Sequence, residues 1–145
     1  MLLVEHMTIS TSATASSTFY PRYYGSANAF DDQRYSLWVG GFQQPHWTFT
    51  IALGGSRLLS EVAIDWYYLY GATDFDLEYS EDGVTFLPLY AGLSELGGIT
   101  APYITTTALD MGELQATHVR LVIHEANRYF PVISEIRVMG WMPMM

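Results

Sequence analysis

The sequence predicts an all-β fold, a jelly-roll β-sandwich of about eight antiparallel strands in a single domain. Three observations lead to this prediction: apolar and polar residues alternate with a period of two, turn-forming residues separate the alternating runs, and no long stretch has helical periodicity. The chain has 145 residues, of which 50% are hydrophobic, so it can bury the core that one domain of this size needs.

The alternation is clearest in four runs, at residues 46–53, 61–67, 74–80 and 117–124. In the first run Trp47, Phe49 and Ile51 occupy every second position, and polar or small residues stand between them. Successive side chains of a strand point to opposite faces, so each run is expected to turn an apolar face to the core and a polar face to solvent.

Shorter or less regular patterns predict four further strands, at residues 9–16, 84–90, 103–109 and 132–138. Turns are expected at residues 54–56 and 71–72, and a hairpin turn at Glu81-Asp82-Gly83. Pro88 has no backbone N–H to donate, so its strand should lie at a sheet edge or contain a bulge. Residues 25–30 are expected to form one helical turn, and the domain core should run from about residue 8 to residue 140, with short extensions at both ends.

The charge of the chain argues against two classes of partner. Fifteen acidic residues stand against six arginines and no lysine, which gives a net charge of −9. Nucleic acid and anionic membranes are both bound through clustered cations, so neither is an expected partner. The absence of cysteine rules out a disulfide scaffold, a thiolate zinc site and a cysteine nucleophile. No secretory signal or membrane-spanning run is visible, and an extracellular or virion surface is the favoured location.

The sequence offers little that would support catalysis. Asp74, Asp76 and Glu78 share one face of a predicted strand, with neighbours about 6 to 7 Å apart, a separation that overlaps glycosidase carboxyl pairs. Nothing nearby would raise the pKa of one of them, so a solvated strand face is the favoured interpretation. His118 and His124 would lie about 20 Å apart, too far to share a metal ion. We therefore expect a protein that is not an enzyme.

Five segments, taken in order, resemble a known family. They are SANAFDD (26–32) with Ser36-Leu37-Trp38, WTFTIALG (47–54), FDLEYSEDGVTF (75–86), ATHVRLVI (116–123) and SEIRVMG (134–140). Together they resemble discoidin domains, also called coagulation-factor C-type domains, of the galactose-binding-like superfamily. The resemblance implies a jelly-roll of about eight strands without catalytic activity, which binds carbohydrate, phospholipid or protein through loops at one end.

The resemblance also implies one structural calcium ion. The ligands it assigns are carbonyls of Asn28, Gln33 and Ser134, carboxylates of Asp31 and Glu135, and the hydroxyl or carbonyl of Ser36. All are hard oxygen donors of the kind that calcium prefers. The alternative is an empty loop in which Asp31 only caps a turn. Asp32 and Ser36 stand where the family usually has Gly and Thr.

Three predicted loops, at residues 19–24, 42–46 and 127–131, combine aromatic residues with Arg, His, Asn or Gln. Sugar recognition uses an aromatic face against C–H groups and polar side chains against hydroxyls, and each loop offers both. The residues predicted to bind a ligand are Tyr20, Arg22, Tyr23, Tyr24, His46, Tyr68, Arg128 and Tyr129. The alternative is that these aromatics cap the end of the sandwich or form a subunit contact.

Two functions therefore remain open. The first is a non-catalytic, lectin-like module that binds carbohydrate or glycoprotein through its end loops, with the structural calcium ion that the resemblance implies as its cofactor. The second is a structural or adhesion subunit of a larger assembly, such as a virion decoration, tail or filament component, that uses the same loops to contact protein subunits. The methionine-rich residues 141–145 would suit such a contact. Lipid binding ranks third because the charge has the wrong sign.

Overall fold

The computed structural model describes residues 4–9, 12–31, 33, 36–67, 70–94, 98–101 and 104–143. The described part of the chain forms nine strands and two short helical turns, α1 (Pro21–Tyr24) and η1 (Ser26–Phe30). The strands are β1 (Val4–Thr8), β2 (Ser12–Ala15), β3 (Trp38–Val39), β4 (Trp47–Tyr67), β5 (Ala72–Ser80), β6 (Leu87–Leu93), β7 (Gly98–Ala101), β8 (Ile104–Ala126) and β9 (Val132–Pro143).

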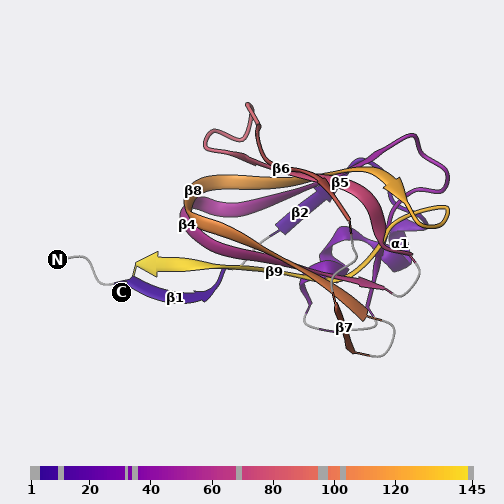
Figure 1. The fold of residues 1–145 in the computed structure, drawn as a ribbon, viewed down its shortest axis with the longest axis horizontal. Coiled ribbons are helices and arrows are strands. Elements are labelled where there is room, and N and C mark those ends of the chain that lie inside the picture. The colour runs from indigo at the N-terminus through magenta and orange to yellow at the C-terminus, as the bar shows by residue number, and fades with distance from the viewer. Residues whose placement is uncertain are drawn as a thin grey trace.

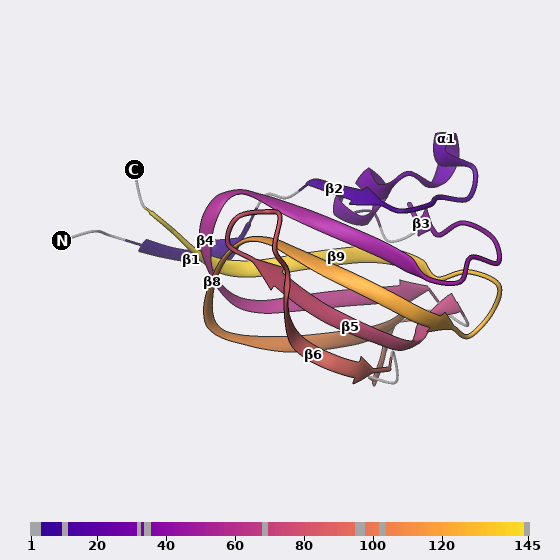
Figure 2. The same cartoon turned by 90° about the horizontal axis from the view of Figure 1, so that it is seen from above.

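All pairs of neighbouring strands are antiparallel, in the order β1-β9-β4-β8-β5-β6, with β2 on β4, β3 on β9 and β7 on β8. The two longest strands bend and so pass through both layers of a sandwich (Figure 2). The first half of β4 pairs with the second half of β8, at Trp47↔Ile123, and its second half pairs with the first half of β8, at Tyr67↔Ile104. The predicted all-β jelly-roll sandwich is confirmed.

The layers follow from this pairing. One layer holds β2, the first half of β4, the second half of β8, β5 and β6. The other holds β1, β9, the second half of β4, the first half of β8 and β7.

Residues 54–56 form a corner within one strand rather than the predicted turn between two separate strands. Gly54 and Gly55 have φ angles of +72° and +139°, which bend the chain while it stays within β4. The partner strand bends alongside, because Arg57 pairs with Ala116 beyond the register shift. The predicted strands at 103–109 and 117–124 are likewise the two halves of β8.

The other boundaries differ in smaller ways. The loop after β5 is longer than predicted, because the Asp82 carboxylate accepts hydrogen bonds from the amides of Val84 and Thr85, so β6 begins only at Leu87. Pro88 lies in an edge strand beside a register shift, as predicted. The predicted strand at 9–16 is shorter, and β1 and β7 were not predicted. The expected C-terminal extension forms the end of β9 and pairs with β1.

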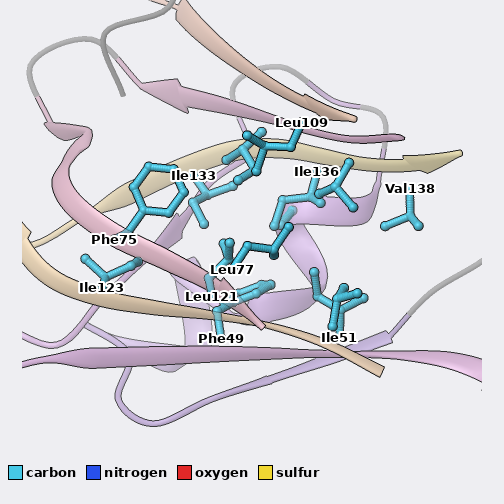
Figure 3. Close-up of a cluster of buried hydrophobic side chains, with 14 of the residues drawn as sticks. Phe49, Ile51, Phe75, Leu77, Leu109, Leu121, Ile123, Ile133, Ile136 and Val138 are labelled. Atoms are coloured by element: carbon cyan, nitrogen blue, oxygen red, sulfur yellow. The ribbon is translucent and has the colours of Figure 1, made fainter. Parts of the chain in front are cut away.

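The core lies between the two layers and consists of the apolar faces that the alternation predicts (Figure 3). Phe49, Ile51, Phe75 and Leu121 have no exposed surface. Trp66 is also fully buried, and its indole N–H finds a partner in the hydroxyl of Thr107 at 3.1 Å. Burial of these large side chains supplies the main driving force for folding.

The two ends of the sandwich differ in character. The chain termini project from one end, and α1 lies at the opposite end together with the loops before β4 and after β8 (Figures 1 and 2). Among the described residues, none of the helical segments has the length and apolarity needed to span a bilayer.

Candidate functional site

Backbone hydrogen bonds join three loops at the α1 end of the sandwich. The amide of Phe19 donates to the carbonyl of Val39 at 2.8 Å, which fixes the segment before α1 beside β3. The amide of Gly40 donates to the carbonyl of Pro131 at 3.0 Å, and the amide of Gln43 to that of Tyr129 at 3.0 Å. The loops at 19–24, 42–46 and 127–131, which the sequence marked separately, therefore form one surface.

Phe130 lies at the centre of an aromatic cluster that supports this surface. Its ring centroid is 5.1 Å from that of Phe19, 6.3 Å from that of Phe42 and 5.6 Å from that of Tyr70. These edge-on and tilted contacts are the geometries that aromatic pairs prefer. Phe19, Phe130 and Tyr70 thus cap the sandwich, as one of the two interpretations of the sequence expected.

Other aromatics of the same loops remain in solvent. Tyr20 is 64% exposed, Tyr23 66%, Phe42 47% and Tyr129 59%. The guanidinium carbon of Arg22 lies 5.8 Å from the centre of the Tyr23 ring, so the two side chains of α1 lie close together. Tyr20 packs edge-on against Phe19, and Phe42 contacts both Tyr129 and Phe130, but each of these rings keeps a large exposed area that is available to a ligand.

A shallow groove of about 380 Å³ lies between the second and third loops. Its lining residues are Gln43, Gln44, Trp47, His124, Glu125, Ala126, Arg128 and Tyr129. We call it the end groove. It presents an exposed aromatic face in Tyr129, a guanidinium in Arg128, and amide groups that can both donate and accept hydrogen bonds. A ligand with hydroxyl groups and an apolar face matches this set.

The local backbone keeps the loops in place. Tyr20 and Gln43 have φ angles of +46° and +51°, a region that side chains other than glycine seldom occupy, and both lie in the candidate loops. Gly40 allows a close approach, since a Cβ atom there would lie 2.8 Å from Cδ1 of Trp47 and 2.9 Å from Cδ of Pro131. The indole N–H of Trp47 in turn donates to the carbonyl of Gly41 at 2.8 Å.

His124 at the rim of the end groove is paired with a carboxylate. Its Nε2 lies 2.8 Å from Oδ2 of Asp76. The hydrogen bond with Asp76 raises the pKa of His124 above its ordinary value, and this effect exceeds that of partial burial, which lowers it. Partial burial alone would raise the pKa of Asp76, but hydrogen bonds from His124 and from the amide of Gly92 hold it below its ordinary value.

The acidic strand face has partners, which bears on the catalytic interpretation. Asp76 pairs with His124, and Glu78 accepts hydrogen bonds from Arg120 at 2.7 and 2.8 Å. A general acid needs a raised pKa, whereas the pKa of Asp76 is lowered. The arrangement is that of a structural ion-pair network along β5 and β8.

The predicted ligand-binding residues divide into three groups. Arg128 and Tyr129 line the end groove, and Tyr20, Arg22, Tyr23 and Tyr24 lie on and beside α1, joined to it through Phe19 and Phe130. His46 is exposed but is not part of the groove lining, and Tyr68 lies outside the described residues.

Sequence reasoning did not assign His124, Glu125 and Trp47 to the site, and it noted Gln43 and Gln44 without choosing them. For His124 the sequence did hold a signal, because this residue lies near the end of the strand that leads into the third loop.

The loop expected to hold calcium is closed by its own hydrogen bonds. The side-chain amide of Asn28 donates to the carbonyls of Tyr23 at 2.9 Å and Leu37 at 3.0 Å, which joins the two ends of the loop. The amide of Gln33 donates to Oδ1 of Asp31 at 3.0 Å, the turn that the alternative interpretation expected. These bonds use the side-chain amide nitrogen of Asn28 and not its backbone carbonyl, the atom that the resemblance assigns to calcium.

The remaining predicted ligands lie on β9 beside this loop. Ser134 and Glu135 are 1% and 8% exposed. Trp38 pairs with Ile133 in antiparallel register, so the residues before Trp38 run alongside those after Ile133. Ser36 precedes this pair, and its amide donates to the carbonyl of Gln33.

The donor set of carboxylates and carbonyls fits the chemistry of calcium. Among the described residues, no three His, Cys, Asp or Glu side chains gather as a metal cluster, so backbone carbonyls would have to complete the coordination.

The sequence profile of the F5/8 type C domain matches residues 12–136, nearly the whole of the sandwich just described. The chain belongs to this family. The resemblance noted in the sequence to discoidin, or coagulation-factor C-type, domains is thereby confirmed. No curated protein sequence matches this F5/8 type C domain closely enough to count as a relative.

Solved structures share the fold of this F5/8 type C domain at low sequence identity. The family 32 carbohydrate-binding module of NanJ from C. perfringens, solved with galactose, is 15% identical with a TM-score of 0.76, over 94% of this chain and 100% of that one. The CBM32-5 module of CpGH89 from Clostridium perfringens, solved with GalNAc-β-1,3-galactose, is 24% identical with a TM-score of 0.73, over 88% and 94%. The chitosan-binding module 1 of a chitosanase/glucanase from Paenibacillus sp. IK-5 is 19% identical with a TM-score of 0.76, over 91% and 96%.

Proposed function

We propose that this F5/8 type C domain is a non-catalytic carbohydrate-binding module whose saccharide site is the end groove. The observation that carries the proposal is the groove itself: an exposed tyrosine, an arginine and two glutamines converge in a shallow open depression beside further exposed aromatics. The carbohydrate-binding modules that share the fold support the same class of ligand.

The chemistry of the end groove suits a sugar with one apolar face. The ring of Tyr129 offers a flat surface to C–H groups, and the guanidinium of Arg128 donates to hydroxyls at the sugar's edge. Gln43 and Gln44 each carry a donor and an acceptor, which fits hydroxyl groups that do both. A backbone fixed by contacts across the loops lowers the entropy cost of binding.

We also propose that one calcium ion stabilises the loop before β3 and joins it to β9. Asp31 and Glu135 would supply the charged oxygens, and Asn28, Gln33, Ser36 and Ser134 would supply carbonyl or hydroxyl oxygens. The support is the burial of Ser134 and Glu135 beside a loop that hydrogen bonds already close. The ion would be structural and would lie outside the end groove.

A glycan array tests the proposed function. Wild-type protein is expected to bind a subset of galactose-, fucose- or glucosamine-type glycans, both with calcium and, more weakly, with chelator. Tyr129→Ala is expected to lose this binding. Leu87→Ala is the matched control, because Leu87 is an exposed apolar residue on β6 outside the groove, 49% accessible. Silence of the wild type across the array would contradict the proposal.

One observation favours a second candidate function, a contact with a protein subunit of a larger assembly. Tyr20 and Tyr23 are the more exposed tyrosines of the surface, yet neither lines the end groove. Tyrosine is enriched in protein interfaces. A monomer in light scattering at all concentrations, together with glycan binding unaffected by Tyr23→Ala, would count against this second candidate.

A further inference from the structure

A second groove, of about 450 Å³, lies on the outer face of the layer formed by β2, β4 and β8. The loop between β5 and β6 forms its wall. In Figure 1 this loop rises at the top of the view, well separated from α1 at the right. We call this depression the face groove. None of its lining residues belongs to the end groove.

Two adjacent cross-strand rows make the floor of the face groove. In one row Thr14 pairs with Thr50, which pairs with Arg120, and in the next row Ala52 pairs with His118. Successive residues of a strand alternate between faces, and the residues between these are buried in the core, so the two rows point outward. The floor therefore presents two hydroxyls, a guanidinium and an imidazole within a few ångströms of one another.

Arg120 is held in one position and its charge is compensated. Its Nε and Nη2 lie 2.8 and 2.7 Å from Oε1 of Glu78, and its Cζ lies 3.9 Å from the centre of the Phe86 ring. Within the described residues, its Nη1 has no protein partner. The ion pair thus presents a fixed donor without net charge, which suits a neutral ligand better than an anion.

The imidazole of His118 adds a polar group to the face groove beside Arg120. The hydroxyl of Thr117 donates to the carbonyl of Ser80 at 3.2 Å and lies 2.9 Å from Nδ1 of His118, which holds the ring in place. The hydroxyls of Thr14 and Thr50 can each donate and accept a hydrogen bond, so the face groove offers acceptors beside the donor of Arg120.

The wall of the face groove is also preformed. Gly83 packs against the imidazole so closely that a Cβ atom there would lie 2.8 Å from Cε1 of His118. The Asp82 carboxylate accepts hydrogen bonds from the amides of Val84 and Thr85, both at 2.8 Å. The loop consequently holds Val84 at the rim with 83% of its surface exposed, and it also contributes Phe86 to the lining of the groove.

We propose that the face groove is a second saccharide-binding site, specific for a neutral sugar residue. Fixed donors and acceptors without net charge match the hydroxyls of such a ligand, and Val84 offers an apolar contact to its C–H face. The site is separate from the end groove, so one domain would hold two saccharides at once. Binding at the face groove does not depend on binding at the end groove, and each can be tested separately.

Nuclear magnetic resonance on the uniformly 15N-labelled chain of 145 residues tests this proposal. The probes are the methyl glycosides of galactose, glucose, mannose, fucose, N-acetylgalactosamine and N-acetylglucosamine, with glucuronate as the anionic comparison. The amides of Thr50, Gly83 and Val84 are expected to shift saturably with at least one neutral probe and less with glucuronate. Thr50→Val is expected to weaken that binding about fivefold, the effect of one lost hydrogen bond.

Thr48→Val is the matched control, because Thr48 is the next outward residue of β4 and is not among the lining residues of the face groove. It should leave the shifts unchanged.

The absence of a saturable shift at the Thr50, Gly83 and Val84 amides with every neutral probe would overturn the proposal, even if the Arg128 and Tyr129 amides respond. Shifts of the same amides with protein concentration alone would assign the face to a second copy of the chain and would also overturn it. A response there without one at Arg128 and Tyr129 would support the face groove and contradict the end groove.

Discussion

The imidazole Nε2 of His124 lies 2.8 Å from Oδ2 of Asp76 and links β8 to β5 at the rim of the end groove. The other carboxylate oxygen of Asp76 accepts a hydrogen bond from the amide of Gly92 on β6, at 2.9 Å. One carboxylate thus connects three neighbouring strands, and it does so where β8 approaches the third loop.

This pair predicts a pH dependence of stability. The raised pKa of His124 means that its contribution is complete below about 6.5 and disappears as pH rises through the folded-state pKa. The lowered pKa of Asp76 means that its contribution is present above about 3.8 and is lost as pH falls through the folded-state value. Between these limits both groups are charged.

Asp76→Asn should therefore destabilise the fold most near pH 5 to 6, and less at pH 8, as measured by urea unfolding at each pH. Both side chains are partly exposed, so the expected loss is only about 0.2 to 1 kcal/mol. Asp74→Asn, on the same strand face, removes only a weaker coulombic effect on His124 and should show a much shallower profile. A loss for Asp76→Asn that is equal at all these pH values would contradict the ion pair.

The close contacts of Gly40 imply that the spacing between the second and third loops controls glycan binding in the end groove. Gly40→Ala introduces a methyl group into contact with Trp47 and Pro131, which should push the second and third loops apart. Such overpacking costs about 1 to 3 kcal/mol, and glycan binding at the end groove should weaken with it. Gly112→Ala is the control, since that residue lies at the far corner with open space around it and a φ of +59°, so it should lose stability without losing binding. Unchanged glycan binding by Gly40→Ala would contradict this role.

The packing of Phe130 implies that this ring stabilises the fold, whereas the exposed ring of the adjacent Tyr129 binds the ligand. Phe130→Ala removes the ring that Phe19, Phe42 and Tyr70 contact, and it should cost about 2 to 3 kcal/mol of unfolding free energy in urea. Tyr129→Ala, an exposed ring, should cost much less and yet lose glycan binding. Equal destabilisation by the two variants would show that the division of the loop into a packed and an exposed aromatic is wrong.

The proposed calcium ion predicts a thermal shift. An ion bound only to the folded state stabilises by about 2.7 kcal/mol at a hundredfold excess over its dissociation constant, which raises Tm by several degrees for a domain of this size. Asp31→Ala should abolish the difference in Tm between calcium and chelator, and Glu81→Gln, an exposed acid elsewhere, should retain it. Identical Tm values for the wild type in calcium and in chelator would contradict the proposed calcium ion.

Local pattern was enough to predict the core, and it was not enough to predict the path of the chain. The alternation at Phe49, Ile51 and Leu121 names residues that are fully buried. Gly54 and Gly55 were expected to reverse the chain, but they bend it within β4. A glycine pair permits either outcome, and the choice depends on a partner strand some 60 residues away, which the local sequence does not contain.

The candidate site shows the same limit. The three aromatic loops were predicted from their composition, and the structure brings them together. Which ring packs and which stays exposed, Phe130 or Tyr129, depends on contacts from other loops. The pairs His124–Asp76 and Arg120–Glu78 depend on the register of β5 against β8. The partners are more than 40 residues apart in the sequence, so local patterns do not predict that they meet.

A crystal structure with the glycan that binds most strongly on the array tests the central claim most directly. We expect a sugar ring in the end groove, with its apolar face against Tyr129 and a hydroxyl within hydrogen-bonding distance of Arg128. A sugar found only on the α1 tyrosines or only in the face groove, with the end groove empty, would contradict the account.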